Sequence, residues 1–341
     1  MKQVWIARAG APEVLEVREA PDPQPGPGEV AIRVAFAGVN FADIMARMGQ
    51  YPDAPPIPCV VGYEVSGEVA ELGAGVEDRS PGLAPGQRVL ALTRFNGYSD
   101  RVCVPAKQVY AVPDGLSLEA AAALPVNYGT AWMALFRLGS LQPGDLVLVS
   151  AVAGGVGQAA LQLCRAHGAR VIGTASASKH ARLRELGVEL CIDSRDGDVA
   201  AAVRAFTGGR GVDLVLESSG KFREGYRLLA PLGRMVMFGV SSFAPGERRN
   251  LLAILKGVLS MPWFHPISLL DKNRAVAGLN MGHLWDELER LRDDMQVMIE
   301  WAAEGKLAPV VDQVFPFVQA PEAQRYIQER KNFGKVLLRA R

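Results

Sequence analysis

One stretch of the sequence has the residue types and the setting to bind phosphate groups. "SAVAGGVGQ" (150–158) follows the apolar run "DLVLVS" (145–150) and opens a segment whose small and apolar residues recur at helical spacing. A glycine-rich turn between a strand and a helix lets the backbone approach a pyrophosphate, and the helix N-terminus offers N–H groups to it. A tight turn without a ligand is the alternative. The expected cofactor contacts in this turn are Ala153, Gly154, Gly155, Val156 and Gly157.

The residues after the next expected strand bear on the choice of cofactor. NAD enzymes with this motif place an acid about 20 residues after the glycines to hold the ribose 2′-hydroxyl. "GARVIGTASASK" (168–179) contains no acid. Hydroxyl groups and cations suit a 2′-phosphate, so we expect NADPH rather than NADH, although Lys179 could instead be a solvated helix residue. The residues expected near the ribose are Thr174, Ser176, Lys179 and Arg195.

A second stretch, "VGYEVSG" (61–67), places one carboxylate, Glu64, among apolar residues and between two glycines. Such a group could be a catalytic acid, a metal ligand or a structural carboxylate. We expect Glu64 to accept hydrogen bonds from buried backbone N–H groups or to pair with an arginine.

Length and composition limit the class of protein that must position these residues. A chain of 341 residues is long enough for two domains, and its formal net charge of +1 argues against nucleic acid as the main partner. No apolar run reaches the 18 residues of a membrane span and no leader is recognisable, so a cytoplasmic protein is expected. The four cysteines are scattered without a C-x-x-C pair, which excludes a cysteine-rich structural zinc site.

The pattern along the chain predicts an α/β fold with two kinds of domain. Residues 1–122 alternate short apolar runs with Pro and Gly turns, which is typical of a β-rich, barrel-like domain. Residues 123–285 alternate strands and helices, including a helix in "EGYRLLAPLG" (224–233) and a strand in "RMVMFGV" (234–240), as in a doubly wound parallel sheet. Residues 286–341 form a C-terminal segment that returns to the first domain, and a long helix is expected at about 284–304.

Two further features of the parallel sheet are expected. Ligands bind at the carboxyl ends of its strands, where two turns offer polar or small groups. The segment "NRAVAGLNMG" (273–282) looks like an edge strand, which invites pairing with a second subunit in a homodimer. The residues of the two turns expected to contact cofactor are Ser218, Ser219, Phe238 and Gly239.

Several stretches resemble one known family. "NFADIMARMGQYP" (40–52), "AVAGGVG" (151–157) and "NFGKVLL" (332–338) together resemble the medium-chain dehydrogenase/reductase superfamily, in its zinc-free quinone oxidoreductase branch. The sequence of these stretches is most similar to the vesicle amine transport protein group, and the chain is also similar to 2-enoyl thioester reductases. The resemblance covers essentially the whole chain and implies a Rossmann NADP-binding domain with a GroES-like, partly open barrel as catalytic domain.

The resemblance also bears on metal binding. Zinc alcohol dehydrogenases of this superfamily hold their catalytic zinc with a Cys and with the His of a Gly-His-Glu motif. The matching positions here are Asn40 and Tyr63, and neither is a plausible zinc ligand. We therefore expect no zinc.

The resemblance assigns roles to individual residues. Tyr51 matches the tyrosine taken as the proton donor of 2-enoyl thioester reductases, although it could simply pack beside Pro52. Asn40 and Asp43 match a motif at the nicotinamide end of the cleft, and Asp43 could equally be a helix N-terminal residue. The remaining residues implied to border the cofactor are Asn127, Thr130 and Asn332.

These expectations favour an NADPH-dependent reductase of a C=C bond conjugated to a carbonyl, acting on a short 2-enoyl thioester, an enone or a quinone. An NADPH:quinone oxidoreductase and a nucleotide-binding interaction or lipid-handling protein without turnover are the alternatives. A coenzyme A thioester would need cations for its phosphates, unless the charges in the less regular region belong only to a solvated surface. Those cations are Arg248, Arg249, Lys256, Lys272 and Arg274.

Overall fold

The computed structural model describes residues 1–79, 82–243, 246–247 and 250–340. It consists of two compact units. The first holds Met1–Gly129, Gly246–Arg249 and Met281–Arg341, and the second holds Thr130–Pro245 and Asn250–Asn280. One unit is rich in antiparallel strands and the other contains a parallel sheet, so the expected α/β class is confirmed. No helix in the described ranges is long and apolar enough to cross a membrane.

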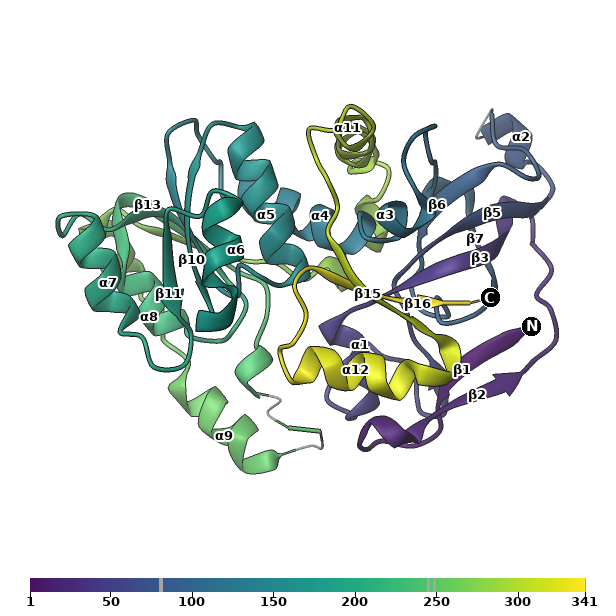
Figure 1. Ribbon diagram of the computed structural model, residues 1–341, viewed down its shortest axis with the longest axis horizontal. Helices are drawn as coiled ribbons and strands as arrows, with labels where there is room; N and C mark the ends of the chain where they lie inside the picture. The colour runs from purple at the N-terminus through teal and green to yellow at the C-terminus, as the bar shows by residue number, and fades with distance from the viewer. Residues whose placement is uncertain (80–81, 244–245, 248–249, 341) are drawn as a thin grey trace. The chain divides into compact units, whose positions relative to one another are not determined.

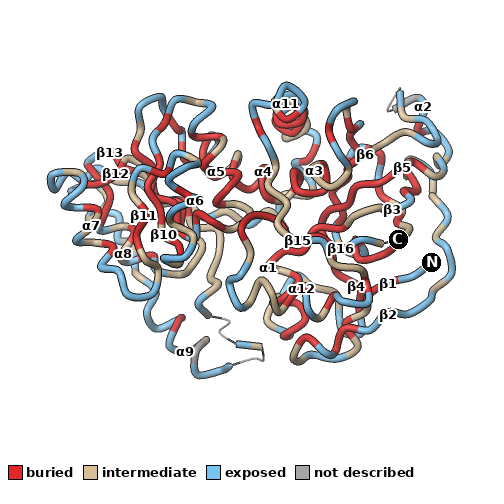
Figure 2. Tube along the Cα trace, in the orientation of Figure 1, coloured by how far each residue is buried: buried red, intermediate tan, exposed pale blue. Residues whose placement is uncertain are grey.

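The second unit is built on a six-stranded sheet in the order β11-β10-β9-β12-β13-β14, with every neighbouring pair parallel. The central strands are largely buried (Figure 2), as expected for strands covered on both faces. Helices α5 and α6 lie on one side of the sheet, and α7 and α8 on the other (Figure 1). The strands are β9 (Leu146–Val149), β10 (Arg170–Ala175), β11 (Leu190–Asp193), β12 (Val212–Glu217), β13 (Leu229–Met237) and β14 (Ala275–Gly278). The helices are α5 (Gly155–Ala166), α6 (His180–Glu185), α7 (Val199–Phe206), α8 (Phe222–Arg227), α9 (Leu251–Ser260) and α10 (Pro266–Lys272).

One expected boundary in this unit was wrong. The helix expected over 224–233 ends at Arg227, and β13 begins at Leu229 instead of at residue 234. Leu229 pairs with Val212 of β12, and the parallel register then shifts so that the next pair is Leu214 with Arg234. Leu232 takes a left-handed conformation (φ 65°), so the strand is irregular where the sequence pattern is ambiguous. The strand expected in 273–282 is confirmed as β14, which is the last strand of the sheet.

The first unit contains a seven-stranded sheet and a three-stranded sheet. The larger has the order β15-β16-β3-β5-β6-β8, with β7 also paired to β3, and the smaller has the order β2-β1-β4. β16 pairs antiparallel with β3, so residues far apart in the sequence share one sheet. The larger sheet consists of β3 (Glu29–Val39), β5 (Glu64–Leu72), β6 (Arg88–Leu92), β7 (Arg101–Pro105), β8 (Val109–Ala111), β15 (Val311–Pro316) and β16 (Lys335–Arg339). The smaller consists of β1 (Lys2–Ile6), β2 (Leu15–Glu19) and β4 (Cys59–Val60).

The long helix expected at 284–304 is shorter. α11 runs from Arg292 to Ala303, and short 3₁₀ turns at Met281–His283 and Trp285–Glu287 occupy the residues before it. Leu284, Leu288 and Leu291 recur at helical spacing, which is why the sequence indicates a longer helix than the structure has. The remaining helices are α1 (Phe41–Arg47), α2 (Val76–Arg79), α3 (Leu118–Ala122), α4 (Pro125–Trp132) and α12 (Ala320–Gln328).

Candidate functional site

The glycine-rich turn forms the start of α5, as the sequence predicted. Gly154 caps α5 in an extended conformation, and the helix is twelve residues long, so its first N–H groups carry the positive end of its dipole. A Cβ on Gly157 would lie 2.5 Å from the carbonyl oxygen of Ala151, which itself has a left-handed φ of 53°. Only glycine at position 157 permits this close turn. These features fit a pyrophosphate.

The turn is also fixed to β10. The N–H of Ala151 donates to Thr174 Oγ1 (3.2 Å), and the N–H of Val152 donates to the carbonyl of Thr174 (3.0 Å). Gly173 makes room for Val152, because a Cβ there would lie 2.7 Å from that side chain. Thr174 therefore positions the turn, which is a structural role that the sequence did not reveal.

The residues expected near the ribose lie at the ends of β10 and β11. Ser176 directly follows β10, and Lys179 ends the 3₁₀ turn after it. Arg195 is exposed beyond β11, and its N–H donates to Asp193 Oδ1 (2.8 Å). Asp193 is the register partner of Ala175, so the neighbouring strand β11 does bring an acid beside this end of β10. The N–H of Arg195 and other backbone N–H groups lower the pKa of the Asp193 carboxyl.

The turns after β12 and β13 meet as expected for the carboxyl ends of neighbouring strands. The N–H of Ser218 donates to Ser150 Oγ (2.8 Å), and Gly239 lies against the backbone of Ser218. Glu217, which the sequence analysis missed, accepts from the N–H (2.6 Å) and the hydroxyl (2.5 Å) of Ser219. The half-buried Phe238 continues β13 next to Gly239. The predicted cofactor contacts thus lie at the carboxyl ends of the parallel strands: residues 153–157, Thr174, Ser218, Ser219, Phe238 and Gly239.

In the first unit, Asp43 lies in the first turn of α1. Its side chain is fully buried, and Oδ2 accepts from the N–H of Asn40 (2.8 Å) and the hydroxyl of Tyr98 (3.0 Å). Oδ1 accepts from the N–H of Gly62 (3.1 Å). Burial raises the pKa of Asp43 to about 7. The three donors and the charge of Lys335 lower this pKa, but their combined effect is smaller than that of burial. Asp43 therefore holds α1 against the Gly62 turn.

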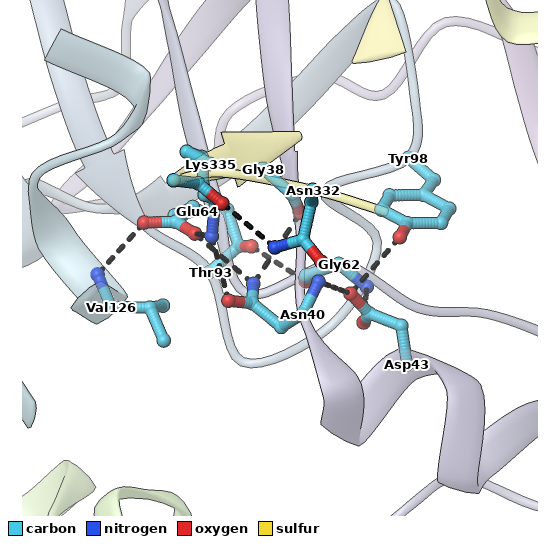
Figure 3. A network of polar contacts seen from close by, with 11 residues as sticks. Gly38, Asn40, Asp43, Gly62, Glu64, Thr93, Tyr98, Val126, Asn332 and Lys335 are labelled. Atoms are coloured by element: carbon cyan, nitrogen blue, oxygen red, sulfur yellow. Dashed lines mark hydrogen bonds and ion pairs between the residues drawn. The ribbon is translucent and has the colours of Figure 1, made fainter. Parts of the chain in front are cut away.

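Glu64 lies at the centre of a buried polar network (Figure 3). Its Oε2 accepts from the N–H of Val126 at the start of α4 (2.8 Å), and its Oε1 contacts the ammonium group of Lys335. Asn40 joins both charges, because Nδ2 donates to Glu64 Oε1 (3.1 Å) and Oδ1 accepts from Lys335 Nζ (2.7 Å). The expected backbone partner of Glu64 is thus present, but the cation is a lysine and not an arginine.

Gly38 makes this position of the carboxylate possible. A Cβ on Gly38 would lie 2.6 Å from the carboxyl carbon of Glu64, inside any tolerable contact distance. The network therefore depends on a glycine in β3 as well as on the four groups that exchange hydrogen bonds.

A pocket of about 310 Å³ lies within the first unit. Tyr51 and Tyr63 meet edge to face with their ring centroids 6.3 Å apart, and Phe95 lies 5.3 Å from Tyr63. His283 Nε2 lies 3.0 Å from each carboxylate oxygen of Asp53, which holds the 281–287 segment against the turn after Tyr51. The lining residues are Tyr51, Asp53, Tyr63, Arg94, Phe95, Gly282, His283, Trp285 and Asp286.

Tyr51 is the one predicted catalytic residue that lines this pocket. It is half-buried, and burial together with the Asp53 charge raises the pKa of its phenol. The hydroxyl therefore keeps its proton at neutral pH and can donate it. Asn40 and Asp43 are buried in the network and do not line the pocket.

Three predicted cofactor contacts lie elsewhere. Asn127 and Thr130 are buried on α4, one helical turn apart, and Asn127 follows the residue that Glu64 binds. Asn332 is half-buried, and its Nδ2 donates to the carbonyl of Gly334 (3.0 Å), directly before Lys335.

The cations considered for coenzyme A do not form a phosphate site among the described residues. Arg274 donates to the carbonyl of Tyr226 (3.0 Å), and the ammonium of Lys272 lies 5.9 Å from the Tyr226 ring centroid. Lys256 is exposed on α9. Arg248 and Arg249 lie outside the described residues.

Metal-binding groups do not cluster in the part of the chain that the structure describes: no three His, Cys, Asp or Glu side chains there are placed to hold an ion. Asn40 Oδ1 instead contacts an ammonium group, and Tyr63 carries a phenol whose pKa is raised by burial. These residues do not fit a zinc ion.

Two domain families match separate parts of the chain. Residues 26–114 match the alcohol dehydrogenase GroES-like domain, and residues 155–304 match the zinc-binding dehydrogenase family. The chain is 41% identical over 327 residues to the human synaptic vesicle membrane protein VAT-1 homolog, covering 95% of this chain and 82% of that protein. It superposes on the Escherichia coli quinone oxidoreductase complexed with NADPH with a TM-score of 0.87 and 26% identity, covering 100% of both chains. It superposes on the CurK enoyl reductase with a TM-score of 0.83 and 27% identity, covering 99% and 98%.

The buried pair makes a testable prediction for stability. Replacing Lys335 by methionine leaves the Glu64 carboxylate buried without its cation, and we expect the free energy of unfolding to fall by about 3–5 kcal/mol. Adding Glu64→Gln should recover part of that loss, because the carboxamide is neutral and can still accept from Val126 N–H. Urea unfolding followed by circular dichroism measures both; a double variant that loses the sum of the single losses would contradict the pairing.

Asp43 predicts a dependence of stability on pH. The pKa of Asp43 is about 7 in the folded chain against an ordinary value of 3.8. Between these pH values the folded chain holds a proton that the unfolded chain has released, so the free energy of unfolding falls as pH rises. We expect the contribution to be complete below pH 3.8 and lost on passing pH 7, and to be absent in Asp43→Asn. Urea unfolding of both chains between pH 4 and 8 tests this, and parallel profiles would refute it.

Proposed function

Because the chain belongs to the medium-chain dehydrogenase/reductase superfamily, in the group of the VAT-1 homologs, we propose that it is an NADPH-dependent reductase of C=C bonds conjugated to a carbonyl. Its substrate would be an enone or a short 2-enoyl thioester. The observation that carries the proposal is the protonated Tyr51 phenol on the wall of an aromatic pocket.

The reaction needs one hydride and one proton. NADPH, when bound, supplies the hydride, which adds to the β-carbon and moves the π electrons toward the carbonyl oxygen. The resulting enolate takes a proton at its α-carbon to give the saturated carbonyl compound. Hydrogen-bond donors in a pocket with little water are enough to stabilise the enolate oxygen, so the reaction does not require a Lewis acid.

The residues proposed to hold NADPH are those of the second unit. The α5 N-terminus and the 153–157 turn would hold the pyrophosphate, and Ser176, Lys179 and Arg195 would hold the 2′-phosphate. The ammonium group of Lys179 favours NADPH, whereas Asp193 beside Ala175 would favour a free 2′-hydroxyl. The backbone N–H groups already on Asp193 leave fewer of its lone pairs for a ribose.

We further propose that the reaction proceeds without zinc. The Lys335 ammonium lies 2.7 Å from Asn40 Oδ1, so a divalent cation bound by Asn40 would meet a fixed positive charge. Tyr63 would have to lose a proton that its burial retains.

A quinone is the second candidate substrate. Four aromatic side chains line the pocket, and their flat surfaces suit a planar, uncharged ring. The pocket carries two carboxylates, Asp53 and Asp286, and one guanidinium group, Arg94, so its charges do not select a phosphate-bearing group. Reduction of a quinone places protons on oxygen, which water can supply, so it depends less on Tyr51.

Turnover and the role of Tyr51 can be tested together. We expect NADPH oxidation with a cyclic enone, a crotonyl thioester or a 1,4-quinone, and a fall of roughly 100-fold or more in kcat/KM for the enone in Tyr51→Phe. Tyr63→Phe is the matched control, because it removes a buried hydroxyl from the same aromatic wall of the pocket. Equal losses in both variants would remove Tyr51 as the donor. NADPH binding without oxidation by any substrate would instead favour a nucleotide-binding protein without turnover.

The choice of cofactor gives a separate prediction. Lys179→Ala should raise the KM for NADPH by roughly tenfold or more and leave the KM for NADH nearly unchanged, because only NADPH carries the 2′-phosphate. Arg184→Ala, at the other end of α6, removes the same charge from an exposed position and should change neither KM. Equal effects of Lys179→Ala on both cofactors would contradict the assignment.

A further inference from the structure

A buried carboxylate in the second unit has one oxygen that the turn around it does not use. Glu217 is the last residue of β12 and is 5% exposed. Its Oε1 accepts three hydrogen bonds, from the N–H (2.6 Å) and the hydroxyl (2.5 Å) of Ser219 and from the N–H of Gly220 (3.1 Å). Its Oε2 accepts none from the described residues and is not completely buried.

The shape of the turn does not account for the charge of Glu217. A glutamine could accept the same three hydrogen bonds through its amide oxygen. Glu217 makes no ion pair with a cation of the described chain, and Lys221, the basic residue next along the sequence, pairs with Glu224 (3.9 Å). Burial of a carboxylate without a cation lowers stability, so the charge has to be explained by something other than packing.

The backbone around Glu217 is fixed. The N–H of Phe238 donates to the carbonyl of Glu217 (3.0 Å), and the N–H of Ser241 donates to the carbonyl of Ser218 (3.2 Å). Gly220 closes the turn with a left-handed φ of 94°. The position of the carboxylate is therefore set before any ligand binds, which reduces the entropy lost on binding.

Glu217 lies where a dinucleotide crosses a sheet of this topology. In the order β11-β10-β9-β12-β13-β14, the chain first adds strands on one side of β9 and then continues with β12 on the other side. Dinucleotides bind at the carboxyl ends of the strands at this reversal, with one mononucleotide on each half. Leu216 is the register partner of Val149, so Glu217 lies beside the start of the glycine turn, on the β12 half of the sheet.

The charge of Glu217 limits which part of a dinucleotide can face it. The residues proposed for the 2′-phosphate, Ser176 and Lys179, follow β10 on the opposite side of β9. A carboxylate repels the pyrophosphate. Carboxylates are, however, the groups with which this fold accepts hydrogen bonds from ribose hydroxyls. On the β12 half, such hydroxyls belong to the ribose that carries the nicotinamide.

We propose that Glu217 is a cofactor-binding residue whose Oε2 accepts a hydrogen bond from a hydroxyl of the nicotinamide ribose. The inference rests on the proposed binding of NADPH and assigns one further residue to that site. The two oxygens of the carboxylate then have separate roles: Oε1 holds the turn at Ser219 and Gly220, and Oε2 binds the ligand.

Calorimetric titration of the intact chain with NADPH and with adenosine 2′,5′-bisphosphate tests the assignment. The bisphosphate carries the 2′-phosphate but lacks the nicotinamide and its ribose. Glu217→Gln keeps an amide oxygen for the three donors and places an N–H₂ group where Oε2 would face the hydroxyl. We expect the Kd for NADPH to rise about tenfold or more and the Kd for the bisphosphate to stay the same. Glu224→Gln, which removes the same charge from α8, is the matched control and should change neither Kd.

Each other outcome would overturn the assignment. An unchanged Kd for NADPH in Glu217→Gln would leave Glu217 with a structural role alone, and equal losses for both ligands would exclude a contact confined to the nicotinamide ribose. A loss that disappears with the 3-acetylpyridine analogue of NADPH, which lacks the carboxamide N–H₂ group, would assign Oε2 to the carboxamide instead.

The same titrations separate this inference from the proposed function. A wild-type chain that binds neither ligand would overturn both. A wild-type chain that binds and oxidises NADPH, with Glu217→Gln binding it equally well, would overturn the role of Glu217 and leave the proposed reductase intact.

Discussion

The buried pair of Glu64 and Lys335 is the interaction on which the first unit depends. Each charge is almost completely removed from water, so each would be costly alone, and only their contact and the hydrogen bonds around it make burial tolerable. Those hydrogen bonds also fix the positions of two helices. Through Val126 the carboxylate fixes the start of α4, and through Asn40 both charges fix the residue that precedes α1.

Asn40 and Asp43, which were expected at the nicotinamide end of the cleft, both hold parts of the first unit together. Asn40 is held by the ion pair and Asp43 by three donors, so neither side chain is free to move. Asp43 accepts a hydrogen bond from the N–H of Gly62, and the next residue, Tyr63, lines the pocket. The motif thus positions an aromatic wall, while Tyr51 on that wall keeps its proton.

Much of the fold was predictable because local pattern and final structure agree. The buried run "LVLV", the glycine turn and the amphipathic α5 follow from residue types alone, and the ends of parallel strands must gather the polar residues that follow them. The residues that the sequence did not reveal depend on contacts between segments far apart in the chain. Nothing in the local sequence marks Lys335 as the partner of a buried carboxylate, because only the pairing of β16 with β3 brings it near Glu64. Likewise, the contact between His283 and Asp53 joins positions that are 230 residues apart. Asp193 was missed because the neighbouring strand, and not the next residues in sequence, brings it beside Ala175.

The partners in the ion pair are separated by 271 residues, and this separation has a consequence for synthesis. During translation the Glu64 carboxylate emerges early, while its ammonium partner is among the late residues to leave the ribosome. Until then β3 also lacks its neighbour β16. The parallel sheet of the second unit uses only residues 146–278 and has all its strands before that point. All strands of the parallel sheet are therefore synthesised before Lys335, whereas Glu64 and β3 obtain their partners only once β16 has been made.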